Sequence, residues 1–549
     1  MRGWFVIAAL VGAGCSGSQP QQPWLQQLPA QSVVRPNVMA QLTGLAGETL
    51  KGPANWPLEL AQDEEPRVLW ITTPDGSIRP GRGRGFKAAL SSALADVSGH
   101  PAWLKLDLVC LSENYRVKLR GGLDGVGFAT PPLALLPDQV SHRTLTRGGK
   151  LRPDYAQRAG WSSAPGKPAF RLRTQQGLWA DGRAVPLFRG HRFFAPGDLS
   201  SALLLERATQ AGDFLVRQLD PGGRFLYIYQ PTVDQPEDSY NLLRHAGCCY
   251  ALAQLSRAAG QPRFAQASAR GLGYLLQQCR PTANRLDLVE KGSVKLGGNA
   301  LAVIAILEYQ EVTGDRRWRG QALALGRSLL KAQSPNGAFP VHKVDFASGD
   351  GLDFTSGYYP GEAILALTYL SRQDPKGPWL AAARRAATYL IEVRDKKVPD
   401  DKLPHDHWLL IALSELQKVT PSPLYVRHMG RICKAICRAQ LRGSQEPDWN
   451  GGFYTPPRLG PTSIRCEGLA AAREWLPQEQ QTQVARALTA GVLFQVQAQL
   501  QPESCVYFPK PERALGAVPR SLTNFELRID YSQHFISAML GARRLFPVP

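Results

Sequence analysis

The stretch DSYNLLRHAGCCYALAQL, Asp238–Leu255, begins with polar residues and continues as an apolar helix from Ala246. Asn241, Arg244 and His245 stand at positions i, i+3 and i+4, so in a helix they share one face. A helix that is apolar all round belongs in the interior of a protein. The stretch therefore predicts a buried helix whose N-terminal end carries functional groups.

This pattern recurs at intervals of about 50 to 65 residues, which indicates an internal repeat. The further copies are KLGGNALAVIAILEYQ at Lys295, TSGYYPGEAILALTYL at Thr355, PHDHWLLIALSEL at Pro404, PTSIRCEGLAAAREWL at Pro461 and RIDYSQHFISAMLGARRL at Arg528. Amphipathic helices such as WLAAARRAATYLIEVR alternate with them. Apolar helices inside and amphipathic helices outside predict a mainly α fold, an (α/α)6 toroid of six helical hairpins over residues 194–549.

Several of the outer helices end in related turns, DPGGRFLYIY, SPNGAFPVH and DWNGGFYTP. Together with the repeat, these turns resemble the six-hairpin glycosidase class, and the resemblance covers roughly residues 198–546. It implies that the inner helices run parallel, so that their N-termini meet at one mouth, the active-site end of that class. Since a fold does not fix an activity, the resemblance leaves the reaction open.

The polar residues at these six N-termini are the candidate site. Aromatic rings that stack on the apolar face of a sugar, beside charged groups that bind its hydroxyls, suit a carbohydrate. We assign to substrate binding Tyr240, Asn241, Arg244, Tyr358, Tyr359, Trp408, Arg465, Glu467, Gln533 and His534, and to catalysis Glu362, Asp406, Asp530, His245 and His407.

The carboxylates favour a glycoside hydrolase, which needs one carboxyl group as acid and a second as base or nucleophile. The histidines favour an alternative, a sugar epimerase or isomerase similar to the N-acylglucosamine 2-epimerase type, because imidazole titrates near neutrality. Arg244 and Arg465 would suit a polyuronate lyase, and a mouth without a working carboxyl pair would suit a glycan-binding lipoprotein. Arg465 and Glu467 are two residues apart, so on a continuous helix only one of them is expected to face the mouth.

Residues 61–193 differ in texture and predict a small α/β domain before the toroid. Strand-like runs (RVLWITT, WLKLDLVCL, GVGFAT) and one helical run, GFKAALSSALADVSG, are separated by many Gly and Pro residues. GRGRG at Gly81–Gly85 lacks the Lys and Ser/Thr of a phosphate loop. No Cys is followed by His and there is no CxxC, so we expect neither a metal nor a cofactor.

The N-terminus, MRGWFVIAALVGAGC, combines Arg2, an apolar run, small residues and Cys15. This is typical of a bacterial lipoprotein signal peptide, residues 1–15, with Cys15 as the acylated residue; an ordinary cleaved signal or a retained anchor are the alternatives. Ser16 resembles lipoproteins that are sorted to the outer membrane. The Gln- and Pro-rich residues beyond it predict a flexible tether over residues 16–60.

The net charge of +19 would suit nucleic acid, anionic lipid or an acidic glycan. A nucleic-acid module usually clusters its charge with aromatic residues, and no dense basic tract occurs here. We therefore expect a carbohydrate substrate, attachment to the membrane of the bacterial cell envelope through the lipid anchor, no nucleic-acid partner and a monomer.

Acylation at Cys15 is testable by intact-mass analysis of the membrane fraction. We expect a diacyl or triacyl addition on a chain that begins at Cys15, because the small residues before it fit a lipoprotein cleavage site. A Cys15→Ser variant that still partitioned fully with membranes would contradict this expectation.

Overall fold

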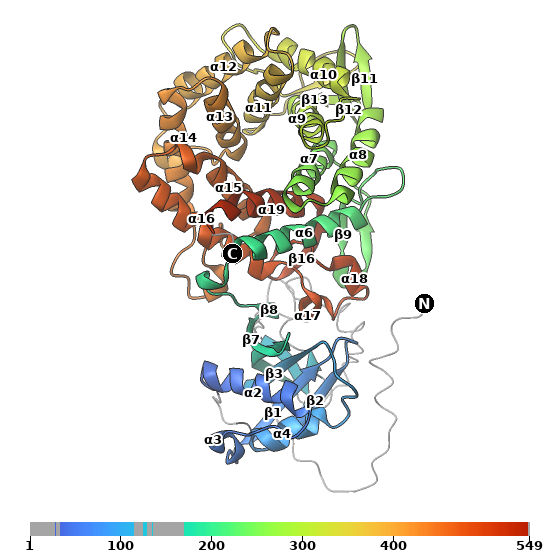
Figure 1. The fold of residues 1–549 in the computed structure, drawn as a ribbon, viewed down its shortest axis with the longest axis vertical. Coiled ribbons are helices and arrows are strands. Elements are labelled where there is room, and N and C mark those ends of the chain that lie inside the picture. The colour runs from blue at the N-terminus through green and yellow to red at the C-terminus, as the bar shows by residue number, and fades with distance from the viewer. Residues whose placement is uncertain (1–27, 29–32, 115–123, 129–133, 136–168, 547–549) are drawn as a thin grey trace.

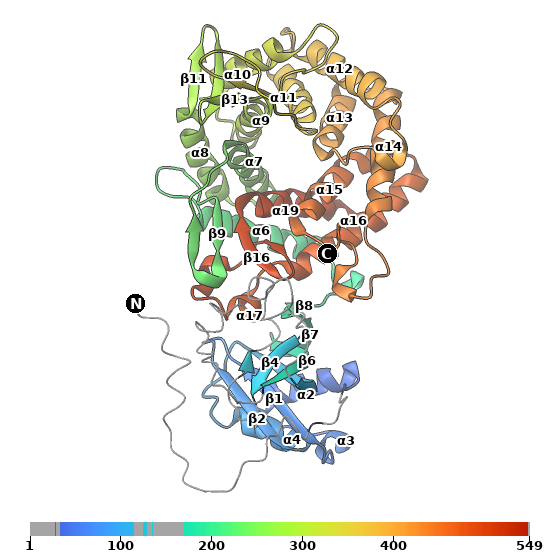
Figure 2. The same ribbon diagram turned by 180° about the vertical axis from the view of Figure 1, so that it is seen from behind.

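The structure of the protein is a computed structural model that describes residues 28, 33–114, 124–128, 134–135 and 169–546. A ring of helices forms the larger part, and a sheet domain lies beneath it (Figures 1 and 2). No helix within these ranges is both long enough and apolar enough to cross a membrane. Cys15 lies outside the described residues.

Within residues 169–546, six inner helices form a closed ring, in which each contacts the next and the last contacts the first. They are α7 (Leu242–Ala259), α9 (Leu296–Thr313), α11 (Tyr359–Gln373), α13 (His407–Val419), α15 (Leu459–Ala472) and α19 (Ile529–Ala542). Because neighbours surround them, these helices are buried on all sides; in α9, residues 296–310 are all buried.

Six outer helices pack into the grooves between neighbouring inner helices. They are α6 (Ser201–Arg217), α8 (Pro262–Gln277), α10 (Arg319–Ala332), α12 (Trp379–Tyr389), α14 (Pro423–Ala439) and α16 (Gln478–Ala498). Their buried residues recur at helical spacing along one face, as Tyr425, Met429, Ile432 and Ile436 do in α14. Amphipathic helices outside and apolar helices inside confirm the predicted (α/α)6 toroid.

The two ends of the toroid differ in the length of their connections. Short connections lead from inner to outer helices, at residues 260–261, 314–318, 374–378, 420–422 and 473–477. Long connections lead from outer to inner helices, at residues 218–241, 278–295, 333–358, 390–406, 440–458 and 499–528. The long connections therefore surround the N-termini of the inner helices, and we call this end the mouth.

Short strands and helices lie within the long connections. They form two four-stranded antiparallel sheets, β10-β9-β16-β15 and β11-β12-β13-β14. The strands are β9 (Ile228–Gln230), β10 (Gln235–Glu237), β11 (Cys279–Thr282), β12 (Arg285–Glu290), β13 (Ser293–Lys295), β14 (Lys343–Asp345), β15 (Pro519–Ser521) and β16 (Asn524–Arg528). The short helices α17 (Pro502–Cys505) and α18 (Pro511–Ala514) belong to the last connection.

The repeated turns owe their sequence to close packing of glycine on the next outer helix. Gly223, Gly337 and Gly451 all have a positive φ. A Cβ atom on them would lie 2.2, 2.3 and 2.0 Å from the carbonyl oxygens of Arg270, Arg385 and Ala490, respectively. Only glycine fits such a position. The phenylalanines two residues later, Phe225, Phe339 and Phe453, are buried in the core of the toroid.

The sheet domain is an antiparallel sheet with the strand order β2-β1-β3-β6-β4-β5, beside which β7 and β8 extend from β6. Its strands are β1 (Pro66–Thr72), β2 (Ile78–Arg84), β3 (Trp103–Asn114), β4 (Asp124–Phe128), β5 (Ala134–Leu135), β6 (Ala169–Ala180), β7 (Arg183–Phe188) and β8 (His191–Arg192). One face packs against α2 (Pro36–Thr49) and α4 (Gly85–Leu94). The small α/β domain predicted from the sequence is present.

The flexible tether predicted over residues 16–60 is wrong for its second half. Helix α2 lies within it, and Met39, Leu42 and Leu45 are buried against the sheet. A further short helix, α3 (Leu58–Ala61), buries Leu60 in the same core. The Gln- and Pro-rich composition that suggested a coil ends before α2, and burial of the apolar face of α2 against the sheet orders this part of the segment.

Polar contacts join the sheet domain to the toroid. Arg192 forms an ion pair of 2.7 Å with Glu503, which is buried. Lys105 Nζ on β3 donates a hydrogen bond of 2.9 Å to Tyr507 Oη, and Arg189 Nη2 lies 2.7 Å from Glu446 Oε2. Both Glu503 and Tyr507 belong to the connection 499–528.

The glycine packing can be tested with Gly337→Ala and a matched variant, Gly349→Ala. Gly349 also has a positive φ, but its Cβ would meet nothing within 4 Å. Gly349→Ala should cost about 1 kcal/mol of stability, the penalty of the left-handed conformation. Gly337→Ala should cost roughly 3 kcal/mol, because the turn must also move away from α12. Equal shifts of the two thermal unfolding midpoints, followed by circular dichroism, would contradict the packing argument.

Candidate functional site

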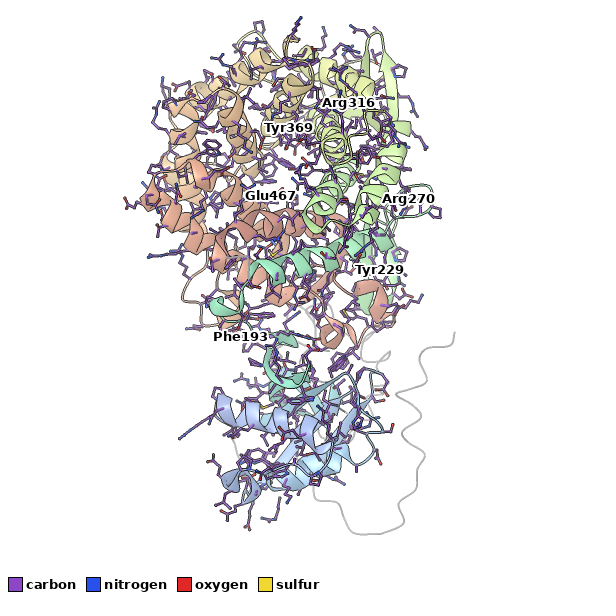
Figure 3. All side chains as sticks on the ribbon, in the orientation of Figure 1. Phe193, Tyr229, Arg270, Arg316, Tyr369 and Glu467 are labelled. Atoms are coloured by element: carbon purple, nitrogen blue, oxygen red, sulfur yellow. The ribbon has the colours of Figure 1, made fainter. Side chains whose placement is uncertain are left out.

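Side chains from different inner helices meet at the mouth. The ring of His407, at the start of α13, lies 5.2 Å from Tyr358 before α11 and 5.3 Å from His534 on α19, measured between ring centres. Glu467 on α15 lies on the inner side of the ring of helices (Figure 3). Residues that are far apart in the sequence therefore form one site, as the toroid predicted.

His407, Glu467 and His534 form the buried centre of this site. His534 Nδ1 and Glu467 Oε2 are 2.8 Å apart and hydrogen-bonded. Neither ring nitrogen of His407 has a hydrogen-bond partner among the described residues. Burial, followed by the nearby positive charges, lowers the pKa of His407 well below its ordinary value. His407 is thus neutral at pH 7, with a lone pair free to accept a proton.

The same three residues could hold a divalent cation. One ligand atom of each lies within 4.8 Å of the others. Two imidazoles and one carboxylate form a ligand set that zinc and non-haem iron use. The hydrogen bond between His534 and Glu467 satisfies that pair without an ion. The geometry permits a cation and does not require one.

Arg244 and Arg528 hold Asp530 at the start of α19. Arg528 donates to the two carboxylate oxygens at 2.5 and 2.8 Å, and Arg244 Nε lies 3.5 Å from Oδ2. Burial alone would raise the pKa of Asp530, but the two guanidinium groups outweigh it and lower the pKa. Asp530 is therefore a carboxylate whose oxygens are already engaged.

Glu362 and Asp406 are buried carboxyl groups whose pKa values are raised, in contrast to that of Asp530. Burial raises the pKa of Glu362 to about 8, although the charge of Arg244 opposes the shift. Burial likewise raises the pKa of Asp406 to about 7 against the charge of Arg394. Asp406 Oδ1 caps α13 by accepting the Leu409 N–H at 3.0 Å. Glu362 Oε2 and Asp406 Oδ2 have no hydrogen-bond partner among the described residues, so Glu362 is mainly protonated at pH 7.

Arg465 and Glu467 extend from α15 to different partners. Glu467 points toward α19, whereas Arg465 runs back along α15 and donates to the Pro461 carbonyl at 2.7 Å. Arg465 Nε also donates to His405 Nδ1 at 2.9 Å. The two side chains thus leave the helix in different directions.

The aromatic residues differ in accessibility. Tyr358 is 37% exposed and stands edge-to-face against His407. Tyr359 is buried and packs against Phe354. Trp408 is only 2% exposed, and its ring lies 5.1 Å from His407. Of the four aromatic residues assigned to substrate binding, Tyr240 is partly buried and Tyr358 is the exposed one, while Trp408 packs beside the imidazoles.

His245 does not lie with the other predicted catalytic residues. Its Nδ1 and Nε2 atoms are each 2.7 Å from a partner, Tyr240 Oη and the Gly271 carbonyl oxygen. Burial lowers the pKa of His245 to about 4. Asn241 caps α7 by accepting the Arg244 N–H. His245, Tyr240 and Asn241 therefore stabilise the first hairpin, and within this group only Arg244 extends into the site.

Gln533 lies next to the centre, with Nε2 at 3.2 Å from His534 Nδ1. The site also contains residues that sequence reasoning did not assign. Arg528 binds Asp530, Arg394 lies 3.9 Å from Asp406, and Tyr454 Oη accepts a hydrogen bond of 3.3 Å from Arg465. Sequence features could have identified two of them. Arg528 lies two residues before the predicted carboxylate Asp530, and Tyr454 follows the phenylalanine of the third repeated turn, DWNGGFYTP.

Comparison of the sequence with protein-family models and with curated proteins finds no match. Among solved structures, D-mannose isomerase matches with a TM-score of 0.50 and 11% identity, over 64% of this chain and 99% of that one. Cellobiose 2-epimerase from Spirochaeta thermophila DSM 6192 gives 0.47 and 16%, over 63% and 96%. The α-1,6-mannanase GH76A from Salegentibacter sp. HEL1_6 gives 0.45 and 12%, over 62% and 99%. The likeness to the isomerase confirms the toroid fold and does not choose a reaction.

The burial of Glu362 predicts how stability depends on pH. Its pKa is about 8 in the folded protein against 4.5 for a free glutamate. Between these values the folded state holds a proton that the unfolded state releases, so stability falls as pH rises. Glu362→Gln should therefore raise the thermal unfolding midpoint by a few degrees at about pH 9 and leave it nearly unchanged at about pH 4. Glu479→Gln, the same change on the exposed surface of α16, is the control, and a pH-independent effect of Glu362→Gln would contradict the pKa shift.

Proposed function

We propose that the protein is a carbohydrate-active enzyme that moves a proton at the carbon next to a sugar carbonyl, as an epimerase or isomerase does. The observation that carries this proposal is the pair His407 and His534, buried imidazoles from two inner helices with ring centres 5.3 Å apart. An imidazole can act as the general base of such a reaction, although burial makes His407 a weaker base than a free imidazole. His407 is neutral and has no hydrogen-bond partner among the described residues, so it is ready to accept a proton.

In this reaction one imidazole removes the proton from the carbon beside the carbonyl of the open-chain sugar. The electron pair moves onto the carbonyl oxygen and gives an enediolate. Return of the proton to the opposite face of the same carbon yields the epimer. Return to the former carbonyl carbon, together with transfer of the hydroxyl proton from one enediolate oxygen to the other, yields the isomer. No oxidant or other reactant is consumed.

The surrounding charges suit an enediolate. Arg244 acts electrostatically on Glu362, Asp530 and His407, which come from three inner helices. Its guanidinium can stabilise the negative charge that develops on the sugar oxygen. Glu467 orients His534 through their hydrogen bond, and Tyr358 offers an accessible ring for stacking on the sugar.

Glycoside hydrolysis is the second candidate, because the environments of two carboxyl groups push their pKa values apart. Glu362, with its raised pKa, could act as the acid, and Asp530, with its lowered pKa, as the base or nucleophile. Against this, both oxygens of Asp530 are held by Arg528. That engagement makes Asp530 a poor nucleophile, so the histidine pair is the stronger hypothesis.

The proposal includes the place of action. Acylation of Cys15 would attach the protein to the bacterial cell envelope, at the outer membrane if Ser16 acts as a sorting signal. A monomer anchored in this way would present the toroid to soluble sugars or glycans.

The proton transfer can be tested by deuterium uptake from heavy water into a panel of reducing sugars that includes mannose, glucose and cellobiose. His407→Asn and His534→Asn should each lower the exchange rate by about 10² to 10⁴, the usual share of a general acid or base. His100→Asn, on the exposed surface of the sheet domain, should leave it unchanged.

Two outcomes would contradict the proposal. Release of sugar from oligosaccharides that depends on Glu362 and Asp530, with the histidine variants active, would indicate a hydrolase. Glycan binding that Tyr358→Ala abolishes, without turnover of any sugar, would indicate a receptor.

A further inference from the structure

A pocket at the rim of the mouth is lined by three arginines. Its walls are Arg458, Pro461, Arg520, Arg528 and Tyr531, and we call it the basic pocket. Arg458 directly precedes α15 and Arg528 directly precedes α19, while Arg520 comes from β15. The backbone of Arg458 pairs with Ser521, so α15 and β15 are joined on this side.

The charges of the basic pocket are not balanced. Arg528 is paired with Asp530, and Arg520 lies 3.6 Å from Glu526. Arg458 has no carboxylate within ion-pair distance among the residues that the structure describes, and its guanidinium lies over the ring of Tyr454. The pocket therefore holds one more positive charge than negative charge. Neither α15 nor α19 has a side-chain cap, so the positive ends of two helix dipoles add to this field.

The basic pocket is connected to the centre of the site on both sides. On one side, Arg465 donates to the carbonyl of Pro461 and to His405. On the other side, Arg528 holds Asp530, which Arg244 also contacts. Arg465, which contacts the pocket wall at Pro461, acts electrostatically on His407, and His534 acts on Asp530, which Arg528 holds.

We propose that the substrate is an acidic sugar, whose anionic substituent binds in the basic pocket while its carbonyl end reaches His407 and His534. A planar carboxylate matches the fork of a guanidinium, and a sulfate or phosphate ester offers the same oxygen geometry. This inference rests on the proposed proton transfer for the orientation of the sugar. The pocket itself requires only a sugar with a negative charge.

The test measures affinity by calorimetry and deuterium uptake for glucuronate, glucose 6-sulfate and glucose 6-phosphate beside neutral glucose, with the full chain. At least one acidic sugar should bind about tenfold or more tightly than glucose, and its affinity should fall as salt rises. The acid that binds best identifies the anionic group. Equal affinity for acidic and neutral sugars would overturn the inference.

Variants of the pocket locate the effect. Arg458→Gln should remove most of the preference for the acidic sugar and leave the affinity for glucose unchanged, whereas Arg458→Lys should keep part of it. Arg316→Gln is the control for general charge, because Arg316 is exposed and lies in the short connection 314–318, at the end of the toroid opposite the mouth. A preference that survives both Arg458→Gln and Arg520→Gln would contradict the assignment to this pocket.

The two proposals fail in different ways. Charge-selective binding without deuterium uptake would refute the proton transfer and leave the basic pocket intact. Deuterium uptake into neutral and acidic sugars alike, with no effect of Arg458→Gln, would refute the pocket and leave the proton transfer intact.

Discussion

Closure of the ring of six inner helices is the constraint on which the rest of the structure depends. Each inner helix has an inner helix on either side and outer helices behind it, so most of its length must be apolar. Polar residues are tolerated mainly at the helix ends, and long connections surround only the N-terminal ends. A ring of parallel helices therefore concentrates the chemistry of six distant segments at one mouth, without any of them being adjacent in sequence.

The burial imposed by the ring also determines the charge state of the site. Carboxyl groups at the mouth either keep a proton, as Glu362 does with its pKa of about 8, or find a cationic partner, as Asp530 does with Arg528. His407 stays neutral for the same reason. The result is a site with neutral proton-transfer groups inside and arginines toward the rim. Such a site favours negative charge that develops on a sugar during reaction.

The repeat, the toroid, the small domain and the polar mouth were all predictable, because hydrophobic patterns and turn glycines depend on local sequence. The rotation of each helix was not predictable. His245 follows Arg244 by one residue, about 100° around the helix, and this turns it toward Gly271 on the outer helix. Helix α2 was not predicted because it is stabilised by packing of its apolar face on the sheet, a contact between segments that are distant in the sequence. Charge partners such as Arg394 come from the long connections. The course of these connections could not be predicted, because their sequences have no helical or strand periodicity.

The connection 499–528 relates the sheet domain to the mouth. It places Arg520 and Arg528 at the basic pocket, and it also supplies Glu503 and Tyr507, which contact Arg192 and Lys105. Glu503 is almost completely buried, and a buried carboxylate that loses its partner is strongly destabilising. Arg192 and Lys105 therefore hold the first part of the connection 499–528, at Glu503 and Tyr507. The last part of the same connection carries Arg520 and Arg528. The sheet domain therefore contacts the same connection that carries two arginines of the pocket, although none of its described residues lines the pocket.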